Sequence, residues 1–512
     1  MRGVYNSVTD IRRKVFAAIA DMAYQDDVDY KERMEAIPYE IIQGKQAKYR
    51  DSVFLERAII GERLRLGMGL PVRDITQAGA ISDGIEESVV AEKYYDQPLV
   101  NIISFACHGC PEKTVMVTNA CQGCLSHQCV EVCPKKAVSI VDGHSEIDSD
   151  ACVKCGKCME ACPYHAIVKI ERPCAASCGM NAIHSDEDGK AQIDYDKCVS
   201  CGQCLVNCPF GAIVDKGQIF QTIHAIKQGD EVVAAIAPAF VGQFGAGVTP
   251  EKVIAAIKEL GFADVVEVAI GADLCTIEEA EDFLDKVPAK QPFMGTSCCP
   301  AWSVMAKKEF PQFKEYISMA LTPMVITARM IKKERPNAKV VFIGPCAAKK
   351  LEASRRSVRS DVDFVLTFEE LMGMFAAKGI DLPQLTEEET FDQGTAAGRE
   401  FAVSGGVAKA VKNLIEKKHP GTQVKIQAAE GLKNCRTMLM MAKAGRLNGY
   451  LLEGMACPGG CVAGAGTLAP ISKASASVKK YANEDPMKHA DESVHSHLVH
   501  DIAHMYDEPA ED

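Results

Sequence analysis

The chain has 512 residues, of which 47% are hydrophobic and 25% charged, and its formal net charge is −12. This composition is typical of a globular protein of about two to four domains, and no apolar run reaches the roughly 18 residues that cross a bilayer. The acidic balance argues against a nucleic-acid or anionic-membrane surface. The N-terminus lacks the apolar core of a signal peptide, so we expect a cytoplasmic protein.

The first 100 residues read as helices, for example at 8–22 and 52–66, and their role is unknown. From 218 to 470, apolar strand segments alternate with amphipathic helices, which predicts an α/β domain of parallel or mixed sheets. In such domains ligands gather beyond the carboxyl ends of the strands. Residues 471–512 are polar and His-rich and predict an appended helical tail.

The α/β region contains six expected strands and four expected helices. The strands are 231–237, 264–270, 339–344, 363–366, 424–429 and 449–454. The helices are 249–262, 277–287, 367–379 and 431–445.

Cysteine is the unusual component of the sequence, because the chain has 23 and no export signal. A cytoplasmic chain would keep disulfides reduced, and so many free thiols would be open to oxidation. Bound metal is the economical explanation. Sixteen of the cysteines lie in the region 101–217, which indicates a dense metal-binding domain.

Two motifs in this region have the spacing C-x2-C-x2-C-x3-C-P of two-cluster bacterial ferredoxins, in which three close thiolates hold one cubane and the fourth binds the other cluster. They are Cys152, Cys155, Cys158 and Cys162, and Cys198, Cys201, Cys204 and Cys208. We therefore expect two [4Fe-4S] clusters, one held by Cys152, Cys155, Cys158 and Cys208 and the other by Cys198, Cys201, Cys204 and Cys162. A zinc site would lack this triple spacing and the terminal proline.

Eight further cysteines suffice for two more cubanes. They are a lengthened motif, Cys121, Cys124, Cys129 and Cys133, and the pairs Cys107/Cys110 and Cys174/Cys178. The lengthened motif could hold its own cluster or exchange its last cysteine with the split set, and Cys107/Cys110 could instead form a zinc knuckle or remain free thiols. Two to four cubanes in series form an electron conduit, which implies a redox enzyme at one end.

Three more cysteine motifs follow predicted strands: TSCCPAW at 296–302, GPCAAKKLE at 344–352 and EGMACPGGCVAGAG at 453–466. In these motifs and their order the sequence strongly resembles the [FeFe]-hydrogenases, over residues from about 105 to 470. The resemblance implies an α/β catalytic domain (mixed sheets flanked by helices), preceded by an α+β ferredoxin-like [4Fe-4S] domain and a helical N-terminal segment. The tail resembles the small-subunit segment that wraps the catalytic domain.

The resemblance also implies the ligands of the H-cluster, which is a [4Fe-4S] cubane joined to a binuclear iron subsite with CO, cyanide and a bridging dithiolate amine. Cys299, Cys346, Cys457 and Cys461 match the cubane ligands, and Cys461 is the thiolate that bridges to the binuclear subsite. Four cysteines from three strand ends also suit one buried cubane on chemical grounds. Cys298 matches the thiol that passes protons to the bridging amine; the alternative is an inert buried thiol.

Three further residues match the surroundings of the binuclear subsite. By resemblance Lys349 donates a hydrogen bond to a cyanide, Glu352 follows it at the family's offset, and Met455 packs over the subsite. Otherwise, Lys349 and Glu352 would form a solvated helix face and Met455 would fill the core.

The same resemblance suggests a proton route. Glu279 aligns with the outer relay carboxylate, Asp282 with the inner one, and Ser318 with the relay serine. The expected order is solvent, Glu279, Ser318, Asp282, Cys298. The alternative is that residues 278–282 form an exposed acidic helix face.

The pocket departs from the main catalytic group at three positions. That group has Met, Ser and Gln where this chain has Gly344, Ala239 and Met324, and these changes resemble the second, less-characterised monomeric group. We expect them to alter activity, redox potential and oxygen response. Cys275 and Cys435 fit no ligand set and are expected in the core.

The resemblance implies an enzyme that interconverts H2 with protons and electrons. Its implied partners are a ferredoxin or similar low-potential carrier and the maturation enzymes that build the H-cluster. No nucleotide-binding motif is credible, since GQFGAGV at 242–248 has the wrong glycine spacing. The alternatives are an H2-sensing regulatory protein and a non-catalytic iron-sulfur assembly or electron-transfer protein of the hydrogenase-like family.

Overall fold

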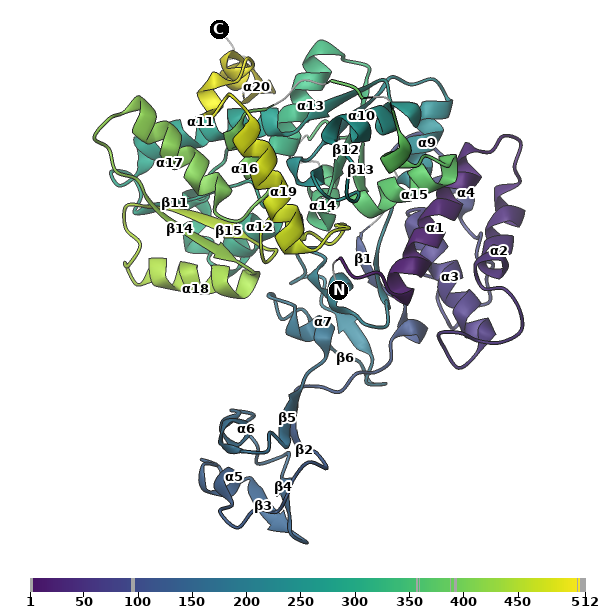
Figure 1. Ribbon diagram of the computed structural model, residues 1–512, viewed down its shortest axis with the longest axis vertical. Coiled ribbons are helices and arrows are strands. Elements are labelled where there is room, and N and C mark those ends of the chain that lie inside the picture. Colours follow the sequence, from purple (N-terminus) through teal and green to yellow (C-terminus); the bar gives the residue numbers. More distant parts are fainter. Residues whose placement is uncertain are drawn as a thin grey trace.

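The computed structural model describes residues 3–93, 97–355, 358, 360–386, 388–390, 394–503 and 505–506. Figure 1 shows a body that contains two sheets, a group of N-terminal helices at its side, and a narrow arm of small sheets that projects from it. Within the described residues, no helix is both long enough and apolar enough to cross a membrane.

The first sheet of the body has the strand order β10-β9-β12-β13, and all its pairings are parallel. The strands are β9 (Val232–Ile236), β10 (Asp264–Glu267), β12 (Lys339–Gly344) and β13 (Phe364–Thr367). The central strand β9 is buried along its whole length. Helices cover both faces of a parallel sheet, so its central strands are apolar on both faces.

The second sheet has the order β11-β15-β14 and is also parallel throughout. Its strands are β11 (Phe293–Gly295), β14 (Lys425–Glu430) and β15 (Tyr450–Met455). The expectation of mixed sheets is therefore wrong for the strands that the structure describes. A helix follows nearly every strand, and such crossovers bring the next strand back in the same direction.

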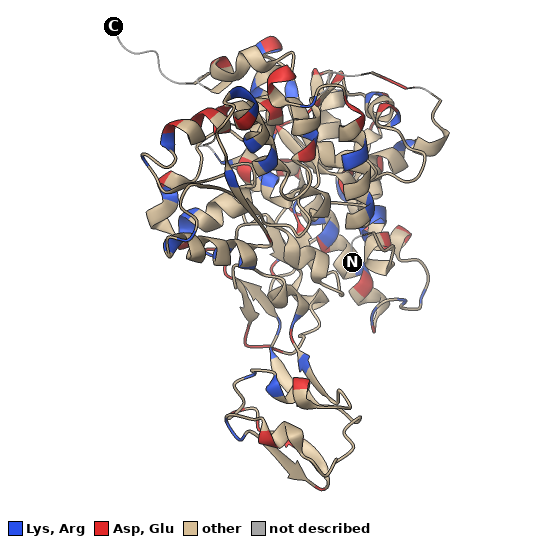
Figure 2. Cartoon of the chain, turned by 60° about the vertical axis from the view of Figure 1, so that its left-hand side comes forward, with Lys and Arg blue, Asp and Glu red and all other residues tan. Residues whose placement is uncertain are grey.

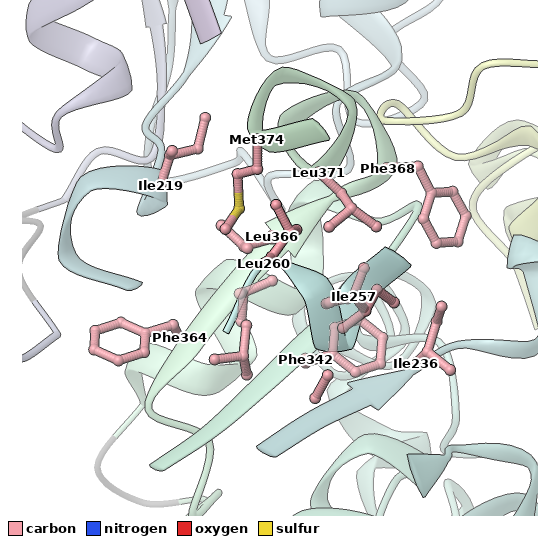
Figure 3. Packing of buried hydrophobic residues seen from close by; sticks show 14 of the residues in the cluster. Ile219, Ile236, Ile257, Leu260, Phe342, Phe364, Leu366, Phe368, Leu371 and Met374 are labelled. Atoms are coloured by element: carbon pink, nitrogen blue, oxygen red, sulfur yellow. The ribbon is translucent and has the colours of Figure 1, made fainter. Parts of the chain in front are cut away.

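The helices that surround these sheets are, in chain order, α9 (Ile219–Lys227), α10 (Pro250–Glu259), α11 (Ala269–Lys286), α12 (Pro300–Glu309), α13 (Pro323–Glu334), α14 (Ala347–Ser354), α15 (Phe368–Lys378), α16 (Ala396–Glu400), α17 (Gly406–Lys418) and α18 (Leu432–Lys443). Figure 3 shows part of the hydrophobic cluster that joins these helices to the first sheet, with Ile257 of α10 near Phe342 of β12 and Leu371 of α15 near Leu366 of β13. This apolar packing fixes the strand ends that carry the candidate site.

Every expected strand and helix of the α/β region is present, with one boundary moved. The expected strand 264–270 ends at Glu267, and α11 begins at Ala269, well before the expected helix at 277–287. Residues 269–277 are buried without exception, so this part of the helix has no polar face that an amphipathic pattern could reveal.

The N-terminal segment forms α1 (Ser7–Tyr24), α2 (Tyr30–Ile41), α3 (Val53–Gly67) and α4 (Ile85–Ser88), which confirms the helices expected at 8–22 and 52–66. Helix α1 packs along α15. Buried side chains such as Ile19 and Leu64 belong to the same hydrophobic cluster as the first sheet. The segment therefore shares a core with the α/β region.

The ferredoxin-like region divides into two modules. The module beside the body contains the pairs β1 (Val100–Ile102) with β8 (Ile213–Asp215) and β6 (Ile183–Ser185) with β7 (Ala191–Ile193), together with α7 (Pro173–Ala176) and α8 (Gln203–Asn207). The arm contains β2 (Thr114–Val117) with β5 (Ile167–Ile170) and β3 (Val138–Val141) with β4 (His144–Ile147), together with α5 (Gln128–Glu131) and α6 (Lys157–Ala161). In Figure 2 basic and acidic residues are mixed over the body, while the arm is mostly tan.

The tail begins with α19 (Ile471–Glu484), which lies across α16, and ends in α20 (Val499–Ala503), which contacts α11 and α13. Part of the expected tail, residues 504 and 507–512, lies outside the described residues. The expected domain boundaries at 100, 217 and 470 stay predictions.

Candidate active site and iron-sulfur sites

A buried cavity lies at the carboxyl ends of both parallel sheets. It is lined by residues that directly follow β9, β10 and β12 and by the last residue of β15. This is where α/β folds place their ligands, because the loops that leave neighbouring strands converge there. Four of the lining residues are the expected cubane ligands Cys299, Cys346, Cys457 and Cys461.

The local fold positions these four thiols. Cys299 and Cys346 are the N-cap residues of α12 and α14. Burial raises the pKa of both thiols, and hydrogen bonds from the backbone N–H groups at the start of each helix oppose this shift. Cys457 follows β15 and accepts a hydrogen bond from Gln203 Nε2 at 3.2 Å. Gly460, with φ of 89°, turns the chain toward Cys461, and a Cβ there would lie 2.5 Å from the backbone nitrogen of Ser404. Only glycine fits that turn.

Cys298, Lys349 and Met455 line the same cavity. The ammonium of Lys349 donates to Thr322 Oγ1 at 3.0 Å and to Glu352 Oε2 at 2.6 Å. Burial lowers the pKa of Lys349, but the Glu352 carboxylate outweighs it and the net pKa is raised. Lys349 is therefore a charged group with three donors, and two protein partners leave a third hydrogen for a ligand in the cavity.

Two of the three unusual pocket residues, Ala239 and Met324, line the cavity as well. Gly344 does not, because the ring of Phe342 lies over it and lines the cavity in its place. A Cβ at Gly344 would approach that ring to 2.5 Å. The sequence analysis missed Phe342; its place two residues before Gly344 on a strand, where alternate side chains share a face, was the available signal.

The expected proton route is wrong in its order. Glu279 is fully buried, whereas Asp282, one turn further along α11, is partly exposed and pairs with Lys286 at 2.7 Å. Glu279 Oε1 accepts hydrogen bonds from the backbone N–H and the hydroxyl of Ser297, at 2.8 and 3.2 Å, directly before Cys298. Glu279 is thus the inner carboxylate and Asp282 the outer one. The alternative of an exposed acidic face is also wrong for Glu279.

Burial raises the pKa of Glu279 to about 8, although the hydrogen bonds from Ser297 oppose this shift. Its second oxygen, Oε2, is buried and has no hydrogen-bond partner among the described residues. A carboxyl group with a pKa near neutrality and a free oxygen is suited to proton transfer. Ser318, the expected relay serine, is buried, and its hydroxyl accepts a hydrogen bond from the N–H of Ala320 at 3.1 Å. Among the described residues it forms no hydrogen bond with Glu279.

The cysteines of the ferredoxin-like region gather around separate small cavities. One is lined by Cys107, Cys110, Cys174 and Cys208, the second by Cys178, Cys198, Cys201 and Cys204, and the third by Cys133, Cys152, Cys155 and Cys158. The four that remain are Cys121, Cys124, Cys129 and Cys162.

The expected pairing of the two regular motifs with each other is therefore wrong. Cys208 completes the set of Cys107 and Cys110, while Cys133 completes the set that begins with Cys152. The crossed ferredoxin rule still holds, but within each module. The arm is an insertion between Cys110 and Cys174 that separates two halves of one motif, and this insertion hid the pairing from an analysis of local spacing.

These sites fit iron-sulfur clusters better than single ions. In the described part of the chain, no three His, Cys, Asp or Glu side chains converge as a single metal ion requires. The cysteines instead surround small cavities in sets of four, the number of thiolates that one [4Fe-4S] cluster needs. Cys107 and Cys110 share their cavity with Cys174 and Cys208, and the zinc-knuckle alternative for the pair stays untested. Cys201 lines both the second small cavity and the large one, so the two sites adjoin.

Three other residues bear on the site. Cys275 and Cys435 are fully buried core thiols, as expected. The sequence analysis missed Glu453, whose buried carboxylate accepts the N–H groups of Gly405 and Ala408 at the start of α17 and holds that helix against β15. A lone acidic residue at the centre of an apolar strand was the signal.

Comparison with known proteins agrees with this arrangement. The family described as "Iron only hydrogenase large subunit, C-terminal domain" matches residues 230–465, and two "4Fe-4S binding domain" families match residues 145–168 and 190–213. These matches support an [FeFe]-hydrogenase-like family for this chain. The large subunit of the periplasmic [Fe] hydrogenase of Nitratidesulfovibrio vulgaris is 30% identical over 263 residues, which are 43% of this chain and 62% of the subunit.

Two more relatives of the chain have names that indicate different functions. Iron hydrogenase 1 of Clostridium pasteurianum is 28% identical over 65% of this chain and 67% of its own length. A probable cytosolic Fe-S cluster assembly factor of Aedes aegypti is 28% identical over 44% of this chain and 58% of its own length. A hydrogenase and a probable assembly factor are thus equally identical to this chain, so identity alone does not choose between their functions. The chain spans about two thirds or less of the length of these relatives.

Proposed function

We propose that this protein is an [FeFe]-hydrogenase that interconverts H2 with protons and electrons. The observation that carries the proposal is the size and lining of the large cavity. Its volume is about 80 Å3, against about 10 to 20 Å3 for each of the three small cysteine-lined cavities. Beyond four cubane ligands it therefore has room for a second group, and Cys298, Lys349 and Met455 line that extra space.

The cofactor that suits this cavity is the H-cluster, held by Cys299, Cys346, Cys457 and Cys461. When bound, its binuclear subsite would supply the cleavage and formation of the H–H bond. The chain's own residues bind and orient the group and move the proton. Lys349, kept charged by Glu352, would donate to an anionic ligand of the cofactor, and Met455, which lines the same cavity, would pack against it.

The proton route runs from solvent to Asp282, then to Glu279, and reaches Cys298 beside Ser297. The exposure of Asp282 and the burial of Glu279 support this direction. Ser318 remains the proposed bridge between the two carboxyl groups, with water available to close a gap.

Electrons leave through the cubanes. The site of Cys201 adjoins the large cavity, and Cys174 of the next site lies within electrostatic reach of Cys204. We propose that this row ends in the arm and passes electrons to a ferredoxin or similar low-potential carrier, and that maturation enzymes assemble the H-cluster. A cytoplasmic location stays the prediction of the sequence.

An iron-sulfur assembly factor is the second candidate, because a protein with that name is as identical to the chain as one of the hydrogenases, at 28%, although over 44% of the chain against 65%. Such a protein would need the cubane alone. Retention of Cys298, Lys349 and Met455 around a cavity of this size favours the enzyme. An H2 sensor would share the cavity and differ in its turnover.

Infrared spectroscopy of anaerobically purified, matured protein tests the proposal. We expect bands from iron-bound CO and cyanide, together with about 22 irons per chain, from four cubanes and a six-iron H-cluster. Hydrogen turnover on the same sample separates enzyme from sensor. If the protein contains iron but lacks the CO and cyanide bands after co-expression with the maturation enzymes, the result would support the assembly-factor candidate.

A further inference from the structure

Three arginines bind the backbone of the loops around the small cavity of Cys107, Cys110, Cys174 and Cys208, and one of them, Arg172, lines the cavity itself. Arg172 is buried and donates through Nη2 to the carbonyl oxygen of Cys110 at 2.8 Å. Arg63, from α3, is buried and donates to the carbonyl oxygen of Gly211, three residues after Cys208. Arg50, which precedes α3, donates to the carbonyl oxygens of Ala106 and Phe210, at 3.2 and 2.7 Å. All three therefore hold the loops that carry the ligands.

No carboxylate pairs with Arg50, Arg63 or Arg172 in the part of the chain that the structure describes. Their partners are carbonyl oxygens and, for Arg172, also the hydroxyl of Ser185 at 3.0 Å. The Nε atom of Arg63 is buried and lacks a hydrogen-bond partner in this part of the chain. By contrast, Arg12 of α1 is neutralised by Glu369 at 2.5 Å. A buried cation without a counter-charge is costly, so this arrangement requires an anion close by.

The anion that the geometry offers is a cluster bound to four thiolates. Cys208 is the strongest negative influence on the guanidinium of Arg63, ahead of Glu369. Oε1 of Glu56, in the same helix as Arg63, accepts the backbone N–H groups of residues 48–50, while its Oε2 is buried and has no hydrogen-bond partner in the described residues, so neither oxygen pairs with Arg63. A [4Fe-4S] cluster with four thiolates carries about two negative charges when oxidised and about three when reduced.

The neighbouring site provides an internal contrast. The cavity of Cys178, Cys198, Cys201 and Cys204 is lined otherwise by Ser200 and by apolar residues such as Val100 and Met180, and by no charged side chain in the described chain. Basic side chains also reach the loops of this site, but Lys308 and Lys433 are exposed to solvent, and Arg436 pairs with Glu309. The positive charge near this cluster is therefore screened or compensated, whereas that of Arg63 and Arg172 is buried and has no carboxylate partner in the described residues.

We propose that Arg50, Arg63 and Arg172 form an arginine collar that raises the reduction potential of the cubane held by Cys107, Cys110, Cys174 and Cys208 above that of its apolar neighbour. Uncompensated positive charge in a medium of low dielectric favours the more negative, reduced form. The cluster passes from [4Fe-4S]2+ to [4Fe-4S]+ by taking one electron, and no bond or proton changes. The electron comes from the neighbouring cubane or from a low-potential one-electron carrier.

This inference rests on the proposed function, and it assigns the N-terminal segment a role. Two of the three collar arginines come from that segment, which contributes no cysteine of its own. The segment packs on the body through α1 and α15 and so brings Arg50 and Arg63 to the ligand loops. The collar cluster then stores an electron between its two neighbours, which suits a reaction that handles electrons in pairs.

A potentiometric titration of the full holoprotein, followed by electron paramagnetic resonance, tests the collar. In Arg63→Gln we expect one [4Fe-4S]+ signal to become at least tenfold harder to form, a shift of about 59 mV to lower potential for one electron. Arg63→Lys keeps the charge and is expected to keep most of the potential. Arg57→Gln is the matched control, since Arg57 lies in the same helix but donates to the carbonyl oxygens of Ile42 and Gly44, away from the cysteines.

If Arg63→Gln does not fold, Arg50→Gln carries the same expectation. The collar is overturned if both variants retain their irons and every signal titrates as in the unaltered protein, or if Arg57→Gln shifts the same signal equally. Missing CO and cyanide bands with a normal set of cubane signals would remove the hydrogenase proposal and leave the collar to be judged by its own titration.

Discussion

The large cavity takes its four expected cluster ligands from three separate strand ends, whereas the ferredoxin-type site of Cys198, Cys201 and Cys204 takes three from one short segment and only the fourth, Cys178, from elsewhere. The loop reveals its chemistry in its spacing. The cavity depends on two parallel sheets that bring their carboxyl ends together. Local spacing therefore identifies most of the cysteines that bind ferredoxin-type clusters, but only the fold shows which cysteines bind the same cluster.

The largest expected effect comes from a substitution in the large cavity. Cys298→Ala should lower hydrogen turnover by on the order of 10²- to 10⁴-fold, because it removes the proton-transferring group nearest the cofactor. Iron content should not change, since Cys298 is not a ligand in the proposal. Turnover assays and iron determination on one sample check this, and unchanged turnover would remove the proton route.

The two carboxyl groups of α11 should differ in importance. Glu279→Gln should lower turnover by about 10²-fold, while Asp282→Asn should cost less than about tenfold, because water can replace an exposed carboxylate but not a buried one. Glu281→Gln, an exposed change on the same helix, is the control. A larger loss in Asp282→Asn than in Glu279→Gln would restore the opposite order.

The pairing of the ferredoxin-type ligands can be tested directly. Cys208→Ser should lose or alter the cluster shared with Cys107, at a cost of up to about four irons, and leave the arm clusters intact. Cys133→Ser should instead affect the cluster of Cys152. Iron counts and electron paramagnetic resonance distinguish the two outcomes. An arm signal altered by Cys208→Ser would return the pairing to the one expected from motif spacing.

Glu279 should also make stability depend on pH. The ordinary pKa of a glutamate side chain, which we take for the unfolded chain, is 4.5, and the pKa of Glu279 in the folded protein is about 8. Folding therefore favours the protonated form of Glu279. The resulting stabilisation is complete below pH 4.5 and is lost as the pH rises toward 8. Relative to Glu279→Gln, the unaltered protein should therefore lose stability over this range. Urea unfolding of both apoproteins at several pH values measures the difference, and parallel curves would contradict it.

The smallest expected effect concerns the wall of the cavity. Gly344→Met should destabilise the protein by about 1 to 3 kcal/mol, because the new side chain overlaps the ring of Phe342. Adding Phe342→Ala should recover part of this loss by removing the ring. Thermal unfolding of the single and double variants checks the expectation, and a double variant less stable than Gly344→Met would contradict the overlap.

Much of this protein was predictable from its sequence. Six of the seven described strands of the two parallel sheets and four of the ten helices around them followed from hydrophobic periodicity, whereas β11 and the other six helices were not predicted. The ligand types followed from motif spacing, which is also a local property of the chain. The cysteines that line the large cavity were identified by resemblance and lie together as expected. The early start of α11 was missed because a fully buried helix shows no polar face.

Only the tertiary structure decided which groups face each other and which are shielded from water. The pairing of Cys208 with Cys107 depends on an insertion that folds away as the arm, and the inner position of Glu279 depends on what covers α11. The tertiary structure also places the ring of Phe342 over Gly344. It likewise brings Arg50 and Arg63 to the loop that follows Cys208, which lies far from them in the sequence. Burial and proximity set potentials and pKa values, and both arise from packing between segments that are far apart in the sequence.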